Sequence, residues 1–166
     1  MNGTELIDDI KLGISKRKWT REEFRNGIMD FEEKLLQVPG VLIGHEMDES
    51  MCPLTHKFID GLYVREIFMP KGIILTSRLH KTNHPYFILR GDVSVATEEG
   101  IVRLVAPYSG ITKAGTKRLL FTHADTVWVT IHATNLTDER QVVAEITSPT
   151  YEDIPEVASE KVESIT

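Results

Sequence analysis

Two histidines that could do chemistry stand four residues apart, at either end of a short polar segment. His80 and His84 bracket residues 81–83, and residues of strand-forming type lie on both sides. A turn between two strands at this point would bring the two imidazoles together. Paired imidazoles suit either a divalent metal ion or a general base that works beside an anion-binding group.

Two glycines flank this histidine pair at defined spacings. Five residues separate Gly72 from Arg78, three separate His80 from His84, and six separate His84 from Gly91. A second glycine-containing stretch covers residues 113–122. These two stretches resemble the two sequence motifs of the cupin superfamily, which implies a jelly-roll β-barrel with a central pocket.

A longer part of the chain carries a narrower resemblance. Residues 61–132 are similar to a group of small cupin-like proteins associated with bacteriophages. The matching segments are residues 80–84, 91–95, 115–118, 125–128 and 131–132. This resemblance implies a phage protein that sequesters a host nucleotide-derived signal.

Two arginines depart from the cupin pattern. Arg78 stands where the first motif has its first His, and Arg118 replaces the His of the second motif. A guanidinium stays protonated, so it cannot ligate a metal ion, whereas it binds phosphate and carboxylate groups well. Together with His80, His84 and Trp128, the arginines predict a pocket for a small anionic, phosphate- or nucleotide-like ligand. Trp128 would stack on a base or sugar if its strand face points inward.

Two other interpretations of these residues stay open. A metal-dependent enzyme, of the isomerase, epimerase, lyase or oxygenase type, would hold a divalent metal ion as cofactor. Its ligands would be His80, His84 and His123, with His132 as the next candidate. Alternatively, the arginines would have only a structural role if they formed salt bridges with acidic side chains, for which the candidates are Glu66, Asp92 and Asp125.

The elements that must position these residues begin with two predicted helices. Thr20 and Glu23 form a capping box, with Trp19 and Phe24 as a hydrophobic staple around it. An apolar stripe at helical spacing runs from Phe24 to residue 35 before a Pro-Gly stop at 39–40. A weaker helix is predicted over 4–14. We expect these helices to cover one face of a β core or to mediate subunit contact.

Short β-branched and aromatic runs follow the predicted helices. They predict strands over residues 41–47, 62–69, 72–79, 86–89, 93–96, 101–105, 117–122, 126–133 and 142–147. The fold class is therefore all-β, a cupin-type jelly-roll β-barrel with an N-terminal helical extension. Its parts are a helical extension over 1–40, a barrel over 41–148 and an acidic tail over 149–166. His45 and His56 are interpreted as structural or solvated.

Composition limits the partners of such a protein. The 166 residues carry 19 Lys and Arg against 25 Asp and Glu, a formal net charge of −6, which argues against a nucleic-acid polymer. Cys52 is the lone cysteine, so an intramolecular disulfide and a Cys-rich zinc module are excluded. No stretch reaches the roughly 18 apolar residues of a membrane span. The sequence predicts a cytoplasmic homo-oligomer, in the host cytoplasm if phage-encoded, that binds a small anionic molecule and no membrane.

Overall fold

The computed structural model describes residues 3–15, 18–36 and 51–154. The predicted strand over 41–47, His45 and the helix stop at 39–40 lie outside the described residues. The helices are α1 (Gly3–Leu12), α2 (Arg21–Leu36), α3 (Glu139–Ile146) and the short 3-10 helix η1 (Tyr151–Asp153). The strands are β1 (Leu54–Ile59), β2 (Leu62–Met69), β3 (Ile74–Thr76), β4 (Leu79–His80), β5 (His84–Arg90), β6 (Asp92–Thr97), β7 (Gly100–Val105), β8 (Tyr108–Thr112), β9 (Leu119–Thr122), β10 (Thr126–Ala133) and β11 (Thr147–Ser148).

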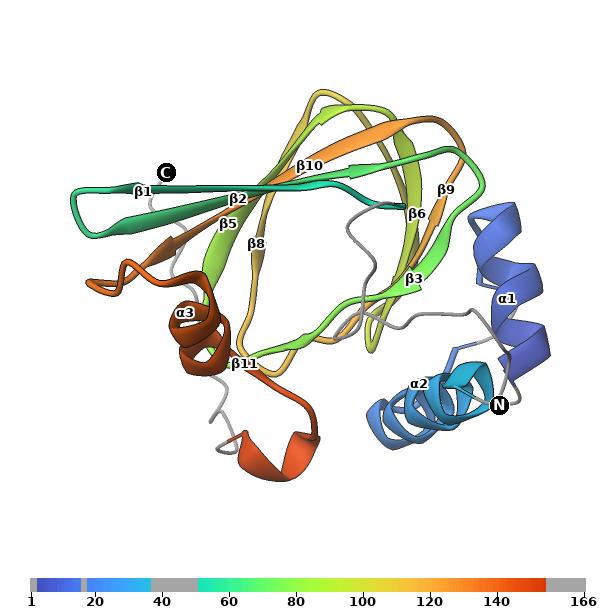
Figure 1. Cartoon of the computed structure of the whole chain (residues 1–166). Coiled ribbons are helices and arrows are strands. Elements are labelled where there is room, and N and C mark those ends of the chain that lie inside the picture. Colours follow the sequence, from blue (N-terminus) through green and yellow to red (C-terminus); the bar gives the residue numbers. More distant parts are fainter. Residues whose placement is uncertain (1–2, 16–17, 37–50, 155–166) are drawn as a thin grey trace, which may run out of the picture.

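Most of the strands form two antiparallel sheets that enclose a barrel (Figure 1), and β4 and β11 form a separate two-stranded sheet. One sheet has the order β1-β2-β10-β5-β8 and the other β3-β9-β6-β7. Strands distant in sequence are therefore neighbours, such as β2 and β10 or β3 and β9, and the chain crosses repeatedly from one sheet to the other. This is the double-sheet arrangement of a jelly roll, so the predicted all-β jelly-roll fold is confirmed.

The N-terminal helices lie on the outer face of the β3-β9-β6-β7 sheet (Figure 1). Their buried side chains form one apolar cluster with the sheet residues Ala96 and Leu119; the helical members are Leu6, Ile10, Phe24, Ile28 and Phe31. The start of α2 has the predicted capping box, since Thr20 N donates to Glu23 Oε2 at 2.7 Å and Glu23 N to Thr20 Oγ1 at 3.2 Å. The extension thus covers one face of the barrel.

A buried ion pair fastens α2 to the barrel. Lys117 Nζ lies 2.8 Å from Glu32 Oε1, and only 4% and 7% of the two side chains are exposed. The Thr76 hydroxyl also donates to this Glu32 oxygen, and Lys117 donates to the Ser77 carbonyl at 3.2 Å. Lys117 therefore contributes to the contact between α2 and the barrel.

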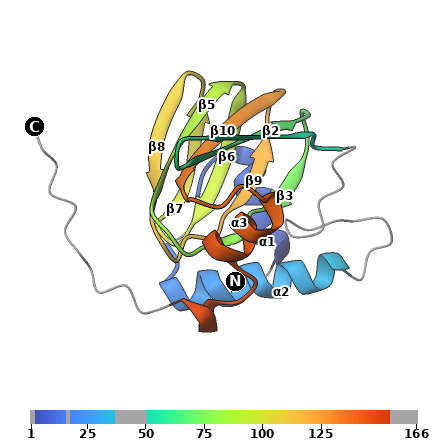
Figure 2. The same ribbon diagram turned by 60° about the vertical axis from the view of Figure 1, so that its left-hand side comes forward.

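The C-terminal part differs from the prediction. Residues 142–146 are not a strand but the end of α3, which begins after Asp138, whose Oδ1 accepts a hydrogen bond from Gln141 N at 3.0 Å. This helix lies across one end of the barrel (Figures 1 and 2), and the two-residue strand β11 then pairs with β4.

Strands β1 and β8 were not predicted. None of the described helices is long and apolar enough to cross a membrane.

Candidate functional site

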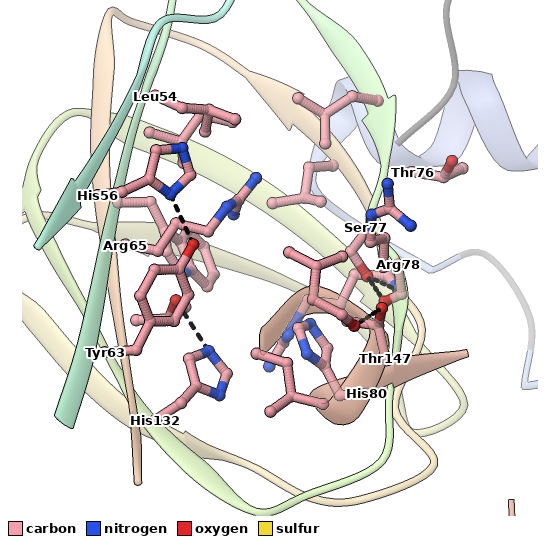
Figure 3. A pocket seen from close by; sticks show the side chains of 18 of the residues that line it. Leu54, His56, Tyr63, Arg65, Thr76, Ser77, Arg78, His80, His132 and Thr147 are labelled. Carbon is pink, nitrogen blue, oxygen red and sulfur yellow. Dashed lines mark hydrogen bonds between the residues drawn. The ribbon is translucent and has the colours of Figure 1, made fainter. Parts of the chain in front are cut away.

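A cavity of about 280 Å³ lies inside the barrel beneath α3. One wall comes from β1, β2 and β10, and the facing wall from β3, β4 and the start of β9. In Figure 3, His56, Tyr63, Arg65 and His132 stand on one wall, opposite Arg78 and His80. The remaining lining residues are Leu54, Ile67, Met69, Leu75, Thr76, Ser77, Arg118, Leu120, Trp128, Thr130, Glu139, Val143, Ile146 and Thr147. Its volume lies near the lower end of the range for small-molecule sites.

Arg118 is the most deeply buried cation of this cavity, with 6% of its surface exposed. Its Nη2 donates to Thr112 Oγ1 at 2.6 Å, and its guanidinium carbon lies 5.2 Å from the Tyr86 ring centre and 5.6 Å from that of Trp128. Burial lowers the pKa of Arg118 to about 10. Within the described part of the chain, no carboxylate forms an ion pair with it.

Trp128 faces inward, which is the orientation in which it could stack on the base or sugar of a bound ligand. On β10, Trp128, Thr130 and His132 are all buried and line the cavity, which is the alternation expected of an inward face. One face of the indole is already covered, because Tyr86 stacks on it with ring centres 4.6 Å apart and an interplanar angle of 15°. A ligand can therefore use only the part of Trp128 that remains open to the cavity.

Arg65 is a cavity cation that was not predicted. It stands on β2 with Tyr63, Ile67 and Met69, and these four alternate residues all line the cavity. This period-two pattern was the available signal for Arg65. Burial lowers the pKa of Arg65, and the charge of nearby Arg78 lowers it further.

Arg78 lines the cavity as predicted, although not by simple strand alternation. The segment between β3 and β4 interrupts the alternation, so Thr76, Ser77 and Arg78 all contribute to the wall. Among the described lining residues, the charged side chains are three arginines and Glu139, a formal net charge of +2 when the histidines are neutral.

The structure brings His80 and His84 together and places His132 beside them. The ring centres of His80 and His84 are 4.5 Å apart, and that of His132 lies 4.1 Å from His84 and 6.3 Å from His80. Burial lowers the pKa of His84 to about 4, that of His132 to about 3 and that of His80 well below its ordinary value. The three imidazoles are therefore neutral near pH 7, and each has one buried ring nitrogen without a hydrogen-bond partner.

The predicted metal ligand His123 does not join this cluster. Its Nε2 lies 2.7 Å from Ser94 Oγ, and the charges of Arg103 and Asp92 act on it. Among residues 3–15, 18–36 and 51–154, no three His, Cys, Asp or Glu side chains are placed to hold a metal ion. The charge of Arg118 also acts on His80 and would repel a cation there. These residues do not fit the metal that a cupin motif implies.

Two of the three carboxylates proposed as structural partners of the arginines, Asp92 and Asp125, are engaged elsewhere. Asp92 accepts from Arg103 Nε at 2.8 Å and Nη2 at 2.7 Å. Asp125 Oδ1 accepts from the backbone N–H of Lys71 at 2.9 Å. Neither carboxylate neutralises Arg118. Arg90, a residue near one end of β5, is exposed and lies outside the cavity.

His56 lies on the cavity wall, although it was interpreted as structural or solvated. Its Nδ1 is 2.6 Å from Tyr63 Oη (Figure 3), and its Nε2 is 3.4 Å from Glu139 Oε2. Burial raises the pKa of Tyr63 to about 12. Three elements thus supply three neighbouring groups: β1 supplies the imidazole of His56, β2 the phenol of Tyr63 and α3 the carboxylate of Glu139.

No protein-family model matches the chain, and no curated protein matches its sequence. Similar solved structures include an acetylacetone dioxygenase from Acinetobacter johnsonii, 16% identical, covering 57% of this chain and 71% of that one, with a TM-score of 0.43. A cupin superfamily protein from Desulfitobacterium hafniense is 13% identical over 54% of this chain and 84% of its own, with a TM-score of 0.45. The cupin domain of Cnp3 from Schizosaccharomyces pombe is 14% identical over 66% of this chain and 72% of its own, with a TM-score of 0.43.

Proposed function

We propose that the barrel cavity binds a small organic anion through a phosphate or carboxylate group. The observation that carries this proposal is Arg118, a buried guanidinium that has no carboxylate partner within the described residues. Leaving a charge buried and unpaired costs several kcal/mol, so such a charge is normally matched by an opposite one. A ligand anion would supply that match, with charge-assisted hydrogen bonds from the guanidinium.

The rest of the lining supports the same type of ligand. Arg65 and Arg78 add positive charge to the cavity, and Glu139 is the single acidic residue among the lining side chains that the structure describes. The unpartnered ring nitrogens of His80 and His132 can hydrogen-bond a neutral or anionic group without adding charge. Apolar side chains fill much of the remaining wall, as in most small-molecule sites.

Within this proposal, a nucleotide is the specific ligand class favoured by the aromatic pair. Arg118 would hold the phosphate, and the open part of Trp128 would contact the base or sugar. A phage protein of this kind would sequester the nucleotide. The phage origin and the sequestering role stay predictions.

Calorimetric titration with inorganic phosphate and AMP tests the proposal. We expect both to bind the wild-type chain, and Arg118→Met to weaken binding about 10- to 100-fold, because hydrogen bonds to charged groups contribute about 1.5–3 kcal/mol. The control is Arg90→Met, which removes an exposed arginine outside the cavity and should leave affinity unchanged. Arg65→Met provides a second cavity variant in case Arg118→Met folds poorly.

Two results would count against this function. If neither inorganic phosphate nor AMP binds, the anion site is overturned. Equal loss of affinity in Arg90→Met would show that binding is a surface effect. Native mass spectrometry of the purified chain reports copurified small molecules, metal and subunit number together. Near-stoichiometric metal that is lost in a His80→Ala, His84→Ala variant would favour the metal-dependent enzyme instead. The subunit number tests the predicted homo-oligomer.

A further inference from the structure

We propose that Tyr63, His56 and Glu139 form a proton relay, and that the cavity is an active site for proton transfer. The substrate would be a small anion that carries an acidic C–H next to a carbonyl group. This inference rests on the proposed function, because the cavity arginines must hold the substrate's anionic group. It goes beyond that function in assigning a reaction class and a set of groups that carry it out.

One hydrogen bond and one carboxylate contact give the three groups their roles. Tyr63 is fully buried, and its Oη lies 2.6 Å from His56 Nδ1. The Glu139 carboxylate lies 3.4 Å from His56 Nε2, a close charge contact rather than a hydrogen bond, because this buried nitrogen has no hydrogen-bond partner among the described residues. A carboxylate on that side favours the tautomer with the proton on Nε2, which leaves Nδ1 free to accept the phenol proton. The remaining lone pair of the phenol oxygen is then available to a bound molecule.

The position of Arg65 adds the electrostatic part. Arg65 follows Tyr63 by two residues on β2, and both side chains line the same cavity. Its charge opposes the effect of burial on the Tyr63 phenol by favouring the ionised form. A fixed cation near the reacting oxygen would stabilise negative charge that develops on the phenol or on the substrate carbonyl, which is a large contributor in many enzymes.

The proposed step balances without any further reactant. Tyr63 Oη takes the proton from the substrate carbon while its own proton moves to His56 Nδ1. The C–H electron pair becomes an enolate whose oxygen lies near the cavity arginines, and the imidazolium is stabilised by Glu139. Return of a proton to the same carbon or a neighbouring one completes an exchange or an isomerisation. Tyr63 is thus the catalytic residue, His56 holds the phenol proton during the step, and Glu139 is a positioning residue that stabilises the imidazolium.

Hydroxyacetone phosphate is a suitable probe because it carries a carbonyl, adjacent C–H groups and a phosphate. Its binding is measured by calorimetry, and its C–H exchange with D2O is followed by proton NMR. We expect the wild-type chain to accelerate exchange, and Tyr63→Phe to lower the rate about 100-fold or more. Phosphate affinity should stay within about threefold in this variant, because the phenol is not part of the proposed anion contact.

Two further variants separate a relay from a merely structural contact. Glu139→Gln and His56→Gln should lower the exchange rate at saturating probe about tenfold while the affinity for the probe stays the same. Tyr108→Phe is the matched control, since this phenol is 41% exposed and outside the cavity, and it should exchange the probe at the wild-type rate.

The outcomes distinguish this inference from the proposed function. A chain that binds inorganic phosphate and the probe but does not exchange it overturns the relay and leaves the anion site intact. Binding of phosphate without binding of the probe also overturns the relay, because no carbon acid then reaches Tyr63. Equal exchange rates in the wild type and Tyr63→Phe refute the role of the phenol. Failure of inorganic phosphate and AMP to bind overturns the proposed function itself.

Discussion

Replacing Lys117 by Met tests the buried ion pair that fastens α2 to the barrel. The substitution removes the ammonium group but keeps most of the side-chain volume. Glu32 then remains buried, with the Thr76 hydroxyl as a donor. We expect a substantial loss of stability, because desolvation of the carboxylate is no longer offset by an opposite charge.

The size of the loss follows from burial and from the remaining contacts. Breaking one partner of a buried pair commonly costs about 3–5 kcal/mol. Because Thr76 still donates to Glu32, we expect the lower part of that range, about 3 kcal/mol. The double variant Lys117→Met, Glu32→Leu removes both charges and should lie within about 1–2 kcal/mol of the wild type, the remaining cost being the unpaired Thr76 hydroxyl.

Urea denaturation followed by far-ultraviolet circular dichroism measures these free energies of unfolding. The matched control is Lys34→Met, which breaks the Asp30–Lys34 pair at 2.7 Å on the exposed surface of α2, where 61% and 47% of the Lys34 and Asp30 side chains are accessible. That control should lose no more than about 0.5 kcal/mol. If Lys117→Met and Lys34→Met lose the same amount, or if the double variant is less stable than Lys117→Met, the reasoning about the buried pair is wrong.

Three further outcomes follow from named residues. Burial lowers the pKa of His84 from 6.5 to about 4. The unfolded state therefore takes up the proton first, and stability falls as the pH drops from about 6.5 to about 4. In urea titrations at pH 7 and pH 4.5, His84→Asn should reduce the loss of stability between the two pH values by on the order of 2 kcal/mol. The Arg103 hydrogen bond lowers the pKa of Asp92 below 3.8, so its stabilisation is present above that pH and is lost on acidification; thermal melts of Asp92→Asn should change less than those of the wild type below pH 4. Gly91 and Gly72 both have positive φ, at 111° and 84°. Only a Cβ at Gly91 would meet backbone atoms, at 2.6 Å from the first Cα of β10. The melting temperature should therefore fall much further for Gly91→Ala than for Gly72→Ala, and equal falls would contradict this reasoning.

The sequence predicted the barrel well because its strands carry strong local signals. The two-residue turn between β6 and β7 lies between the predicted strands 93–96 and 101–105, and β7 begins at Gly100, whose φ is 124°. The capping box of Thr20 and Glu23 likewise marks the start of α2 correctly. Residues 142–146 were assigned to a strand because valines favour strands, but Val142 and Ile146 recur at helical spacing and are buried together. Packing on the barrel end outweighed β propensity there.

The candidate site was predicted in part, for reasons that are visible in the strands. His80 and His84 lie beside each other because the turn between them is local. His132 was ranked behind His123, although His132 shares the inward face of β10 with Trp128, whereas His123 follows the end of β9 and contacts Ser94. Strand alternation was therefore a better guide than distance along the chain.

The contact between His56 and Glu139 could not be predicted from the sequence. The two residues are far apart along the chain, and their contact depends on how α3 packs against β1 across the end of the barrel. No local pattern encodes that packing, because it depends on the combined shape of both sheets. Tyr63 was likewise hidden within an ordinary strand-forming run.

The aromatic pair of this cavity also has an optical consequence. The Trp128 indole lies against Tyr86 and close to the Arg118 guanidinium, so a molecule that enters the cavity changes the polarity around the fluorophore. The chain has two tryptophans, and Trp19 is distant from this wall, with its indole N–H bonded to the Thr97 carbonyl. In a Trp19→Phe chain, all tryptophan emission would come from the cavity wall. Occupancy of the cavity would then be read as a change in emission, without any attached label.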